Sequence, residues 1–143
     1  MYILTTPQRG GFLKLSPMKN TIIIFDDDAE ILQICAIILE ARGFKVITCM
    51  NCDDIIDRIK SSGAQVILMD NSIPQTGGIA ATKLIKETEE TRNIPVIFFS
   101  ANSNVAVMSQ QAGAEYYLAK PFDITELEET VSQALSRAER LAS

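Results

Sequence analysis

The chain alternates short apolar runs with longer stretches in which apolar residues recur three and four positions apart. The apolar runs have the length and β-branched content of strands buried on both faces; they lie at 21–25, 45–50, 64–70, 94–100 and 115–120. The intervening stretches have the spacing of helices that bury one face; they lie at 29–42, 53–62, 79–91, 104–111 and 124–142. Short loops between alternating strands and helices favour parallel strands joined by crossover helices. The pattern therefore predicts an α/β fold, a doubly wound sheet of five parallel strands.

Residues 1–19 do not follow this pattern. They contain two prolines and two glycines without a sustained period, and they lack the basic start and apolar stretch of a signal peptide. We expect a flexible N-terminal extension at 1–19 and one domain at 20–143. The extension is either native or translated from upstream of a start at Met18, and an extra strand over YILTT is the alternative.

Composition narrows the class of protein. The 143 residues fit one domain, and a formal net charge of -5 argues against direct binding of nucleic acid. No apolar run approaches the roughly 18 residues of a membrane span. Three cysteines argue against a disulfide scaffold and favour a cytoplasmic location. The absence of histidine excludes Ser-His and Cys-His nucleophile pairs within the chain.

Residues able to take part in chemistry lie at the carboxyl ends of four of the five predicted strands: Asp26, Asp27, Asp70, Ser100 and Lys120. The carboxyl ends of parallel strands meet at one edge of a sheet, where ligands of such folds bind. Crowded carboxylates raise one another's pKa unless a cation balances them, and oxygen ligands suit Mg²⁺. An aspartate can act as a nucleophile towards a phosphoryl group, whose oxygens a lysine and a hydroxyl can bind. The edge is therefore predicted to hold a metal site, a nucleophile, a hydroxyl donor and a cation.

Four segments at these strand ends together resemble the receiver domain of response regulators in two-component signalling: IIIFDDDAEIL, VILMDNSIPQTGG, IPVIFFSA and AGAEYYLAKPF. Each motif is weak alone, but four in the family's order, each at a predicted strand end, are a specific signal. The resemblance covers about residues 20–139. It implies a single-domain response regulator with the flavodoxin-like receiver fold, strand order 2-1-3-4-5.

The resemblance also implies residue roles in phosphoryl transfer. Mg²⁺ is expected to be bound by Asp27 and Asp70 directly, by Asp26 through water, and by the backbone carbonyl of Ser72. Asp70 is the expected phosphoacceptor, taking the group from a phosphohistidine of a sensor histidine kinase or phosphotransfer protein. Lys120 would pair with the phosphoryl oxygens. The chain would then be a signalling phosphoacceptor in a phosphorelay and not an enzyme, apart from catalysing its own phosphotransfer and autodephosphorylation.

A switch is implied as well. Ser100 is expected to move towards the phosphoryl group, and Tyr117 to turn inward. This would change the face formed by helix 104–111, strand 115–120 and helix 124–142, to which a downstream protein or a second copy would bind.

Some positions depart from the commonest family pattern. Ala29 stands where proline is frequent, Ile73 replaces the usual methionine, and Ser100 replaces threonine but keeps a hydroxyl. None of these changes removes a chemical role. The Lys120-Pro121 bond is expected to be cis by resemblance to the family.

Two other functions remain open from sequence. A haloacid-dehalogenase-type phosphohydrolase would use Asp26 as nucleophile in an Asp26-x-Asp28 motif, but Glu30 stands where threonine belongs and Asp70 would have no role. The other alternative is a receiver-like interaction module that works without phosphorylation. The retained acidic residues, hydroxyl and lysine count against it.

Some residues have simpler interpretations. Asp28 fits the N-cap of the helix that follows it. Cys49 and Cys52 form a CxxC motif, which could be a redox pair but lies away from the predicted site. Cys35 lies on the apolar stripe of its helix and is expected in the core.

Overall fold

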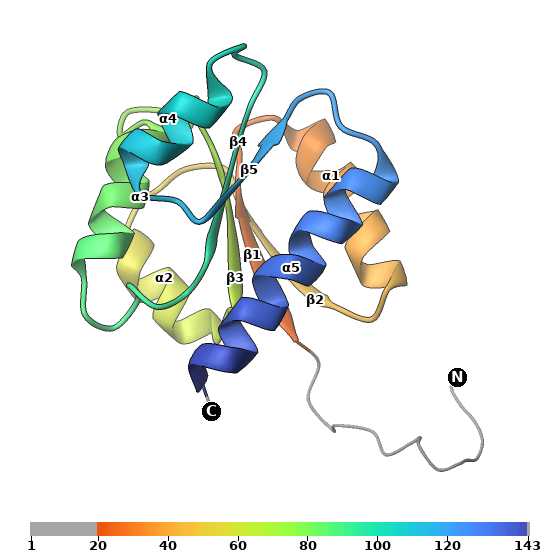
Figure 1. Cartoon of the computed structure of the whole chain (residues 1–143), viewed down its shortest axis with the longest axis horizontal. Helices are drawn as coiled ribbons and strands as arrows, with labels where there is room; N and C mark the ends of the chain where they lie inside the picture. The colour runs from red at the N-terminus through yellow and green to blue at the C-terminus, as the bar shows by residue number, and fades with distance from the viewer. Residues whose placement is uncertain (1–19, 143) are drawn as a thin grey trace.

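Five short parallel strands form one sheet in the computed structural model, which describes residues 20–142 (Figure 1). The sheet order is β2-β1-β3-β4-β5, as the family resemblance implied. The strands are β1 (Thr21–Phe25), β2 (Lys45–Cys49), β3 (Val66–Asp70), β4 (Val96–Ser100) and β5 (Tyr116–Ala119). The predicted N-terminal extension, and the alternative strand within it, lie outside the described residues.

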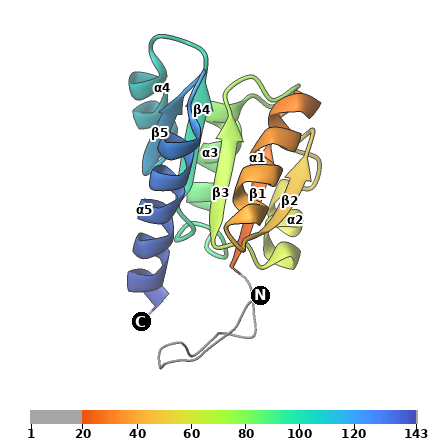
Figure 2. The same ribbon diagram turned by 90° about the vertical axis from the view of Figure 1, so that its right-hand side faces the viewer.

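Helices cover both faces of the sheet. Helices α1 and α5 lie on one face and α2, α3 and α4 on the other (Figures 1 and 2). Their bounds are α1 (Ala29–Ala41), α2 (Ile55–Ser62), α3 (Gly78–Glu87), α4 (Val105–Ala112) and α5 (Ile124–Ala142). None of the helices described here is both long and apolar enough to cross a lipid bilayer. The doubly wound α/β fold is confirmed.

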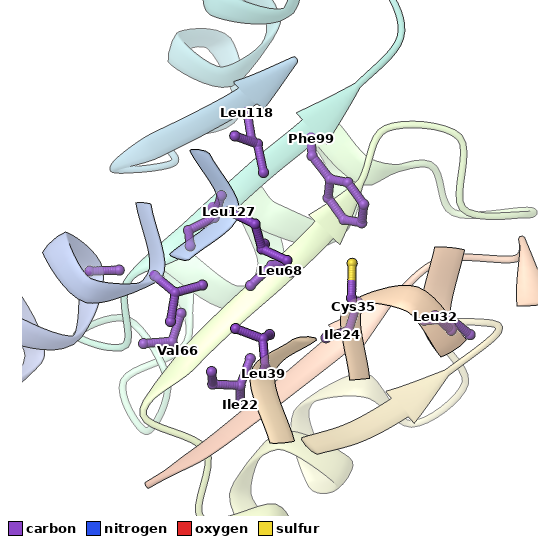
Figure 3. Close-up of a cluster of buried hydrophobic side chains, with 13 residues drawn as sticks. Ile22, Ile24, Leu32, Cys35, Leu39, Val66, Leu68, Phe99, Leu118 and Leu127 are labelled. Carbon is purple, nitrogen blue, oxygen red and sulfur yellow. The ribbon is translucent and has the colours of Figure 1, made fainter. Parts of the chain in front are cut away.

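The three central strands are buried along their whole length, which is why they read as continuous apolar runs. Alternate side chains of these strands point to opposite faces of the sheet, so that a hydrophobic core forms on each face. Figure 3 shows one of them, where α1 and α5 pack on the sheet with Ile24, Leu68 and Phe99. The predicted core position of Cys35 is confirmed, since its side chain is fully buried there. A core on both faces fixes the sheet and therefore the positions of the residues at its carboxyl edge.

Helix α3 is shorter than predicted. The apolar spacing predicts a helix to residue 91, but the helix ends at Glu87. The buried hydroxyl of Thr91 donates to the carbonyl of Ile85 at 2.8 Å, folding the chain back against the helix. The ammonium of Lys86 donates to the carbonyl of Ile94 at 2.8 Å and pairs with Glu115 at 2.8 Å. These contacts, two with the turn that follows the helix and one with Glu115, accompany the early end of the helix, and helical periodicity does not record them.

Candidate functional site

Asp26, Asp70 and Lys120 meet at the carboxyl edge of the sheet. Asp26 follows β1, Asp70 ends β3 and Lys120 follows β5. The Lys120 Nζ lies 2.8 Å from Asp26 Oδ2 and 2.7 Å from Asp70 Oδ1. The two aspartates are only 1% and 4% exposed, so one ammonium bridges two desolvated carboxylates. Sequence reasoning assigned Lys120 to phosphoryl oxygens and did not predict this bridge.

Backbone amides hold the second oxygen of each carboxylate. Asp26 Oδ1 accepts from the Asp28 N–H at 2.8 Å, and Asp70 Oδ2 accepts from the Ser72 N–H at 2.9 Å. The amides come from the loop that follows each strand. Each carboxylate is therefore bound at both oxygens, which fixes its orientation at the sheet edge.

Burial and hydrogen bonding have opposite effects on the pKa values of Asp26 and Lys120. Burial raises the pKa of the Asp26 carboxyl, and the charge of Asp70 adds to this, against the hydrogen bonds from Lys120 and the Asp28 amide. Burial disfavours the charged form of Lys120, but hydrogen bonds to Asp26 and Asp70 outweigh it and raise the pKa of Lys120. The ammonium therefore stays protonated, and the site carries an excess of negative charge that a cation would relieve.

Replacing Asp26 with asparagine is expected to stabilise the metal-free protein at neutral pH, by about 1 kcal/mol. The folded-state pKa of Asp26 lies above its ordinary value of 3.8. As the pH falls through that raised pKa, the folded wild type takes up a proton before the unfolded chain does and recovers stability. The advantage of Asp26→Asn should therefore shrink on acidification, as thermal unfolding followed by circular dichroism would measure. An advantage that grows on acidification contradicts the argument.

Asp27 completes an acidic cluster with a solvent-facing side. Ligand oxygens of Asp26, Asp27 and Asp70 lie within 4.8 Å of one another, and Asp27 is exposed. Three hard carboxylate donors, open to water on one side, suit a divalent cation such as Mg²⁺, which keeps several water ligands. The predicted metal residues that contribute side chains are thus brought together by the fold.

Ser100 and Tyr117 lie on the same half of the sheet but do not bond to the acidic cluster. The Ser100 hydroxyl accepts from the Asn102 N–H at 3.0 Å and is buried. Tyr117 lies on the edge strand β5 and is 52% exposed. Tyr116 points to the other face, packing against the core under α1 and α5, as strand alternation predicts.

Phe99 is a residue of the site that sequence reasoning missed. The Lys120 Nζ lies 4.6 Å from the centroid of its ring, and Phe122 packs edge-on against that ring with centroids 6.4 Å apart. A cation over an aromatic face is stabilised by the ring quadrupole. The signal was available, because Phe99 immediately precedes Ser100 at a strand end and Phe122 follows Lys120-Pro121. The Lys120-Pro121 bond is cis, as expected.

Gly78 allows α3 to begin against the backbone of the site. Its N–H donates to the Asn71 carbonyl at 2.9 Å. A Cβ at this position would clash with the Asp70 carbonyl and lie 2.8 Å from the Asn71 Cα. Both obstacles are backbone atoms, which cannot rotate away. Only glycine therefore lets the helix approach the end of β3 this closely.

Gly78→Ala is expected to destabilise the protein by about 3 kcal/mol, the upper end of the usual cost of overpacking because both obstacles are backbone atoms, and to displace Asp70. Gly113→Ala is the matched control: its Cβ would meet only the Lys86 Cγ, at 3.8 Å, although φ is +86°. The left-handed backbone conformation there should cost alanine about 1–2 kcal/mol. Urea unfolding of both variants measures the difference. Equal losses would show that the close approach at Gly78 is not limiting.

The sequence also singled out Asp28, Cys49 and Cys52. Asp28 is the N-cap of α1, accepting from the N–H groups of Glu30 and Ile31, as predicted. Cys49 and Cys52 are free thiols in the core against α2 and α3. Burial raises the pKa of the Cys52 thiol to about 11, which leaves little reactive thiolate. The CxxC motif therefore fits packing better than redox chemistry.

Comparison with known proteins identifies relatives. The family described as response regulator receiver domain matches residues 22–132. The CAI-1 autoinducer sensor kinase/phosphatase CqsS of Vibrio cholerae is 30% identical over 114 residues, which cover 78% of this chain and 17% of that protein. The polar-differentiation response regulator DivK of Brucella anthropi is 28% identical over 123 residues, covering 85% of this chain and 100% of that protein. The chain thus spans less than a fifth of one relative and the full length of the other.

A solved structure agrees with this family match. A CheY-like response regulator receiver domain protein from Methanospirillum hungatei JF-1 superposes with a TM-score of 0.76 at 25% identity, covering 86% of this chain and 98% of that one. The match to receivers over most of the chain does not favour the phosphohydrolase alternative. Asp28, the second aspartate of that motif, is occupied as a helix cap.

Proposed function

Because the chain belongs to the response regulator receiver domain family, we propose that it is a phosphoacceptor of a two-component phosphorelay with Asp70 as the accepting residue. One observation carries this proposal. Asp70 is buried at a strand end, bonded to Lys120 at 2.7 Å and to the Ser72 amide at 2.9 Å, beside two further aspartates. The carboxylate is oriented, and positive charge lies where a transferred group would bring negative oxygens.

The proposed step uses the residues of this chain as follows. A carboxylate oxygen of Asp70 bonds to the phosphorus, and the bond between that phosphorus and the donor's imidazole nitrogen breaks. The electron pair returns to the imidazole. Lys120 stays close to the Asp70 carboxyl and pairs with a phosphoryl oxygen. The Ser100 hydroxyl moves away from the Asn102 amide and donates to another phosphoryl oxygen. The arrangement described above, with Ser100 bonded to that amide, precedes the transfer in this proposal.

Mg²⁺ belongs to the same proposal. Asp27, Asp70 and the backbone carbonyl of Ser72 would bind it directly, with Asp26 acting through water. The ion would supply positive charge that offsets repulsion between the carboxylates and the incoming phosphoryl oxygens. The oxygen-only donor set and the excess negative charge of the cluster support this choice.

Mg²⁺ at ten times its dissociation constant is expected to raise the free energy of unfolding by about 1.4 kcal/mol, because it binds the folded state only. Thermal unfolding across a Mg²⁺ titration, at constant ionic strength, measures this. Asp27→Asn should weaken the response, whereas Asp57→Asn on the exposed face of α2 should leave it unchanged. An equal response in all three proteins would place the ion elsewhere.

The donor is proposed to be a sensor histidine kinase or a phosphotransfer protein. Residues 1–143 contain no histidine, so the phosphohistidine comes from outside this segment. Helix α1 begins beside the site and exposes Ile34 and Ile37 by 49% and 60%. An exposed apolar face on the helix that begins at the site suits a docking partner.

Output is proposed to pass through the face of α4, β5 and α5. Val107 and Tyr117 are 55% and 52% exposed on this face. Inward rotation of Tyr117, following the movement of Ser100, would change the surface that a downstream protein or a second copy binds. A cytoplasmic location belongs to the same proposal.

The test is incubation with Mg²⁺ and acetyl phosphate, followed by intact mass and by mapping of the modified residue. One acid-stable, base-labile phosphoryl group on Asp70 is the expected result. Modification of Asp26 instead would revive the phosphohydrolase. No modification, either by acetyl phosphate or by a panel of phosphorylated histidine kinases, would favour an interaction module that works without phosphorylation.

A further inference from the structure

Thr82 carries a buried hydroxyl without a partner. Thr82 is fully buried on α3, and its Oγ1 has no hydrogen-bond partner within residues 20–142. A buried hydroxyl that loses water and gains nothing is unfavourable, and each such group calls for an explanation. The role proposed above does not use this residue.

The neighbours of Thr82 along α3 place it beside α4. One turn before it, Ile79 packs against the small cluster of Phe98, Val105 and Ala112, which includes the first and last residues of α4. One turn after it, the Lys86 Cγ lies 3.8 Å from where a Cβ of Gly113, the cap of α4, would be. The two helices contact each other side by side (Figure 1). Thr82 therefore lies on the side of α3 that packs against α4.

The middle of α4 carries the second buried hydroxyl of this region. Ser109 is 3% exposed, and its Oγ donates to the Tyr116 carbonyl at 3.3 Å. That distance is longer than the roughly 2.5–3.0 Å usual for a hydroxyl donor to an oxygen. Tyr116 immediately precedes Tyr117, the proposed switch residue. The Ser109 hydroxyl thus ties α4 to β5 through a weak bond, and α4 packs against the helix that carries the unpartnered Thr82 hydroxyl.

Few buried apolar side chains hold α4 in its present arrangement. Among residues 20–142 its cluster contains three buried apolar residues, Phe98, Val105 and Ala112, with Ile79, Met108 and Ala114 packed against them. The two other hydrophobic clusters are much larger. Few buried apolar contacts characterise elements that move at low cost. A helix held by few apolar contacts and a long hydrogen bond can exchange one polar contact for another.

We infer that Thr82 and Ser109 are positioning residues of the switch: their hydroxyls are apart in the arrangement described here and bond to each other when α4 repacks after phosphorylation of Asp70. The unpartnered Thr82 hydroxyl then disfavours the starting arrangement and is satisfied in the final one. The pair thereby shifts the switch equilibrium towards the phosphorylated arrangement. This inference rests on the proposed function and identifies residues that regulate it.

A cycle of variants tests the inference. Wild type, Thr82→Val, Ser109→Ala and the double variant are melted with Mg²⁺ alone and with Mg²⁺ plus beryllium trifluoride, a stable mimic of the phosphoryl group. With Mg²⁺ alone, Thr82→Val should raise Tm by about 3 °C, because an isosteric methyl replaces an unpartnered hydroxyl. With the mimic it should lower Tm by about the same amount. The two substitutions should be non-additive only with the mimic.

Thr91→Val is the matched control. Thr91 is equally buried, but its hydroxyl donates to the Ile85 carbonyl at 2.8 Å. It should lower Tm equally under both conditions. Thr82→Ser, which keeps a hydroxyl, should retain the wild-type response to the mimic. Thr82→Val should also slow phosphorylation by acetyl phosphate about fivefold, whereas Thr91→Val should not.

The outcomes separate the inference from the proposed function. If the mimic shifts the Tm of wild type but Thr82→Val changes Tm equally with and without it, the hydroxyl is structural and the inference alone is wrong. If the mimic changes the Tm of neither wild type nor Asp70→Asn, the proposed function fails and the inference fails with it.

Discussion

Asp70→Asn is expected to abolish incorporation of the phosphoryl group, with a loss of at least about a hundredfold in initial rate. The amide has no anionic oxygen with which to attack phosphorus. It keeps the size of the side chain and one oxygen that can accept from the Ser72 amide, so the fold should persist. Intact mass after incubation with acetyl phosphate and Mg²⁺ measures the loss.

The matched control for Asp70→Asn is Asp28→Asn. Asparagine caps helices about as well as aspartate, so the N-cap of α1 should survive. Asp28→Asn should therefore be phosphorylated at the wild-type rate. Full incorporation into Asp70→Asn would show that the accepting residue lies elsewhere.

Lys120→Met is expected to slow phosphorylation about a hundredfold and to destabilise the metal-free protein by about 3 kcal/mol. The rate falls because an oriented cation at the reacting oxygens is lost, and single donors of this kind contribute two to three orders of magnitude. Stability falls because Asp26 and Asp70 remain buried beside each other without their shared ammonium. Methionine keeps an unbranched apolar chain of nearly the same length without the charge.

Mg²⁺ separates the two effects of Lys120→Met. The ion can balance the two carboxylates and should recover much of the lost stability, but it cannot replace the ammonium at the phosphoryl oxygens. Chemical unfolding and the rate of mass increase, each with and without Mg²⁺, provide the measurements. Lys83→Met, on the exposed side of α3, should change neither. A wild-type rate in Lys120→Met would remove this lysine from the proposed mechanism.

The sequence determined the fold class and the residues at the sheet edge. Strands buried on both faces must be continuous apolar runs, and amphipathic helices must repeat every three to four residues, so both signals are local. The ends of parallel strands lie on one edge whatever their order, which is why Asp26, Asp70, Ser100 and Lys120 could be grouped. The family motifs added the order β2-β1-β3-β4-β5, which the structure confirms.

Contacts between residues far apart in the chain could be identified only from the tertiary structure. Lys120 reaches Asp70 across 50 positions and Asp26 across 94, and whether it bridges both depends on the twist and spacing of strands that are not neighbours in sequence. The early end of α3, the clash that a Cβ of Gly78 would meet, and the unpartnered hydroxyl of Thr82 also depend on packing, although the first two involve residues as few as six to eight positions apart. Each depends on what packs against a residue, whereas periodicity records only which face of an element is buried.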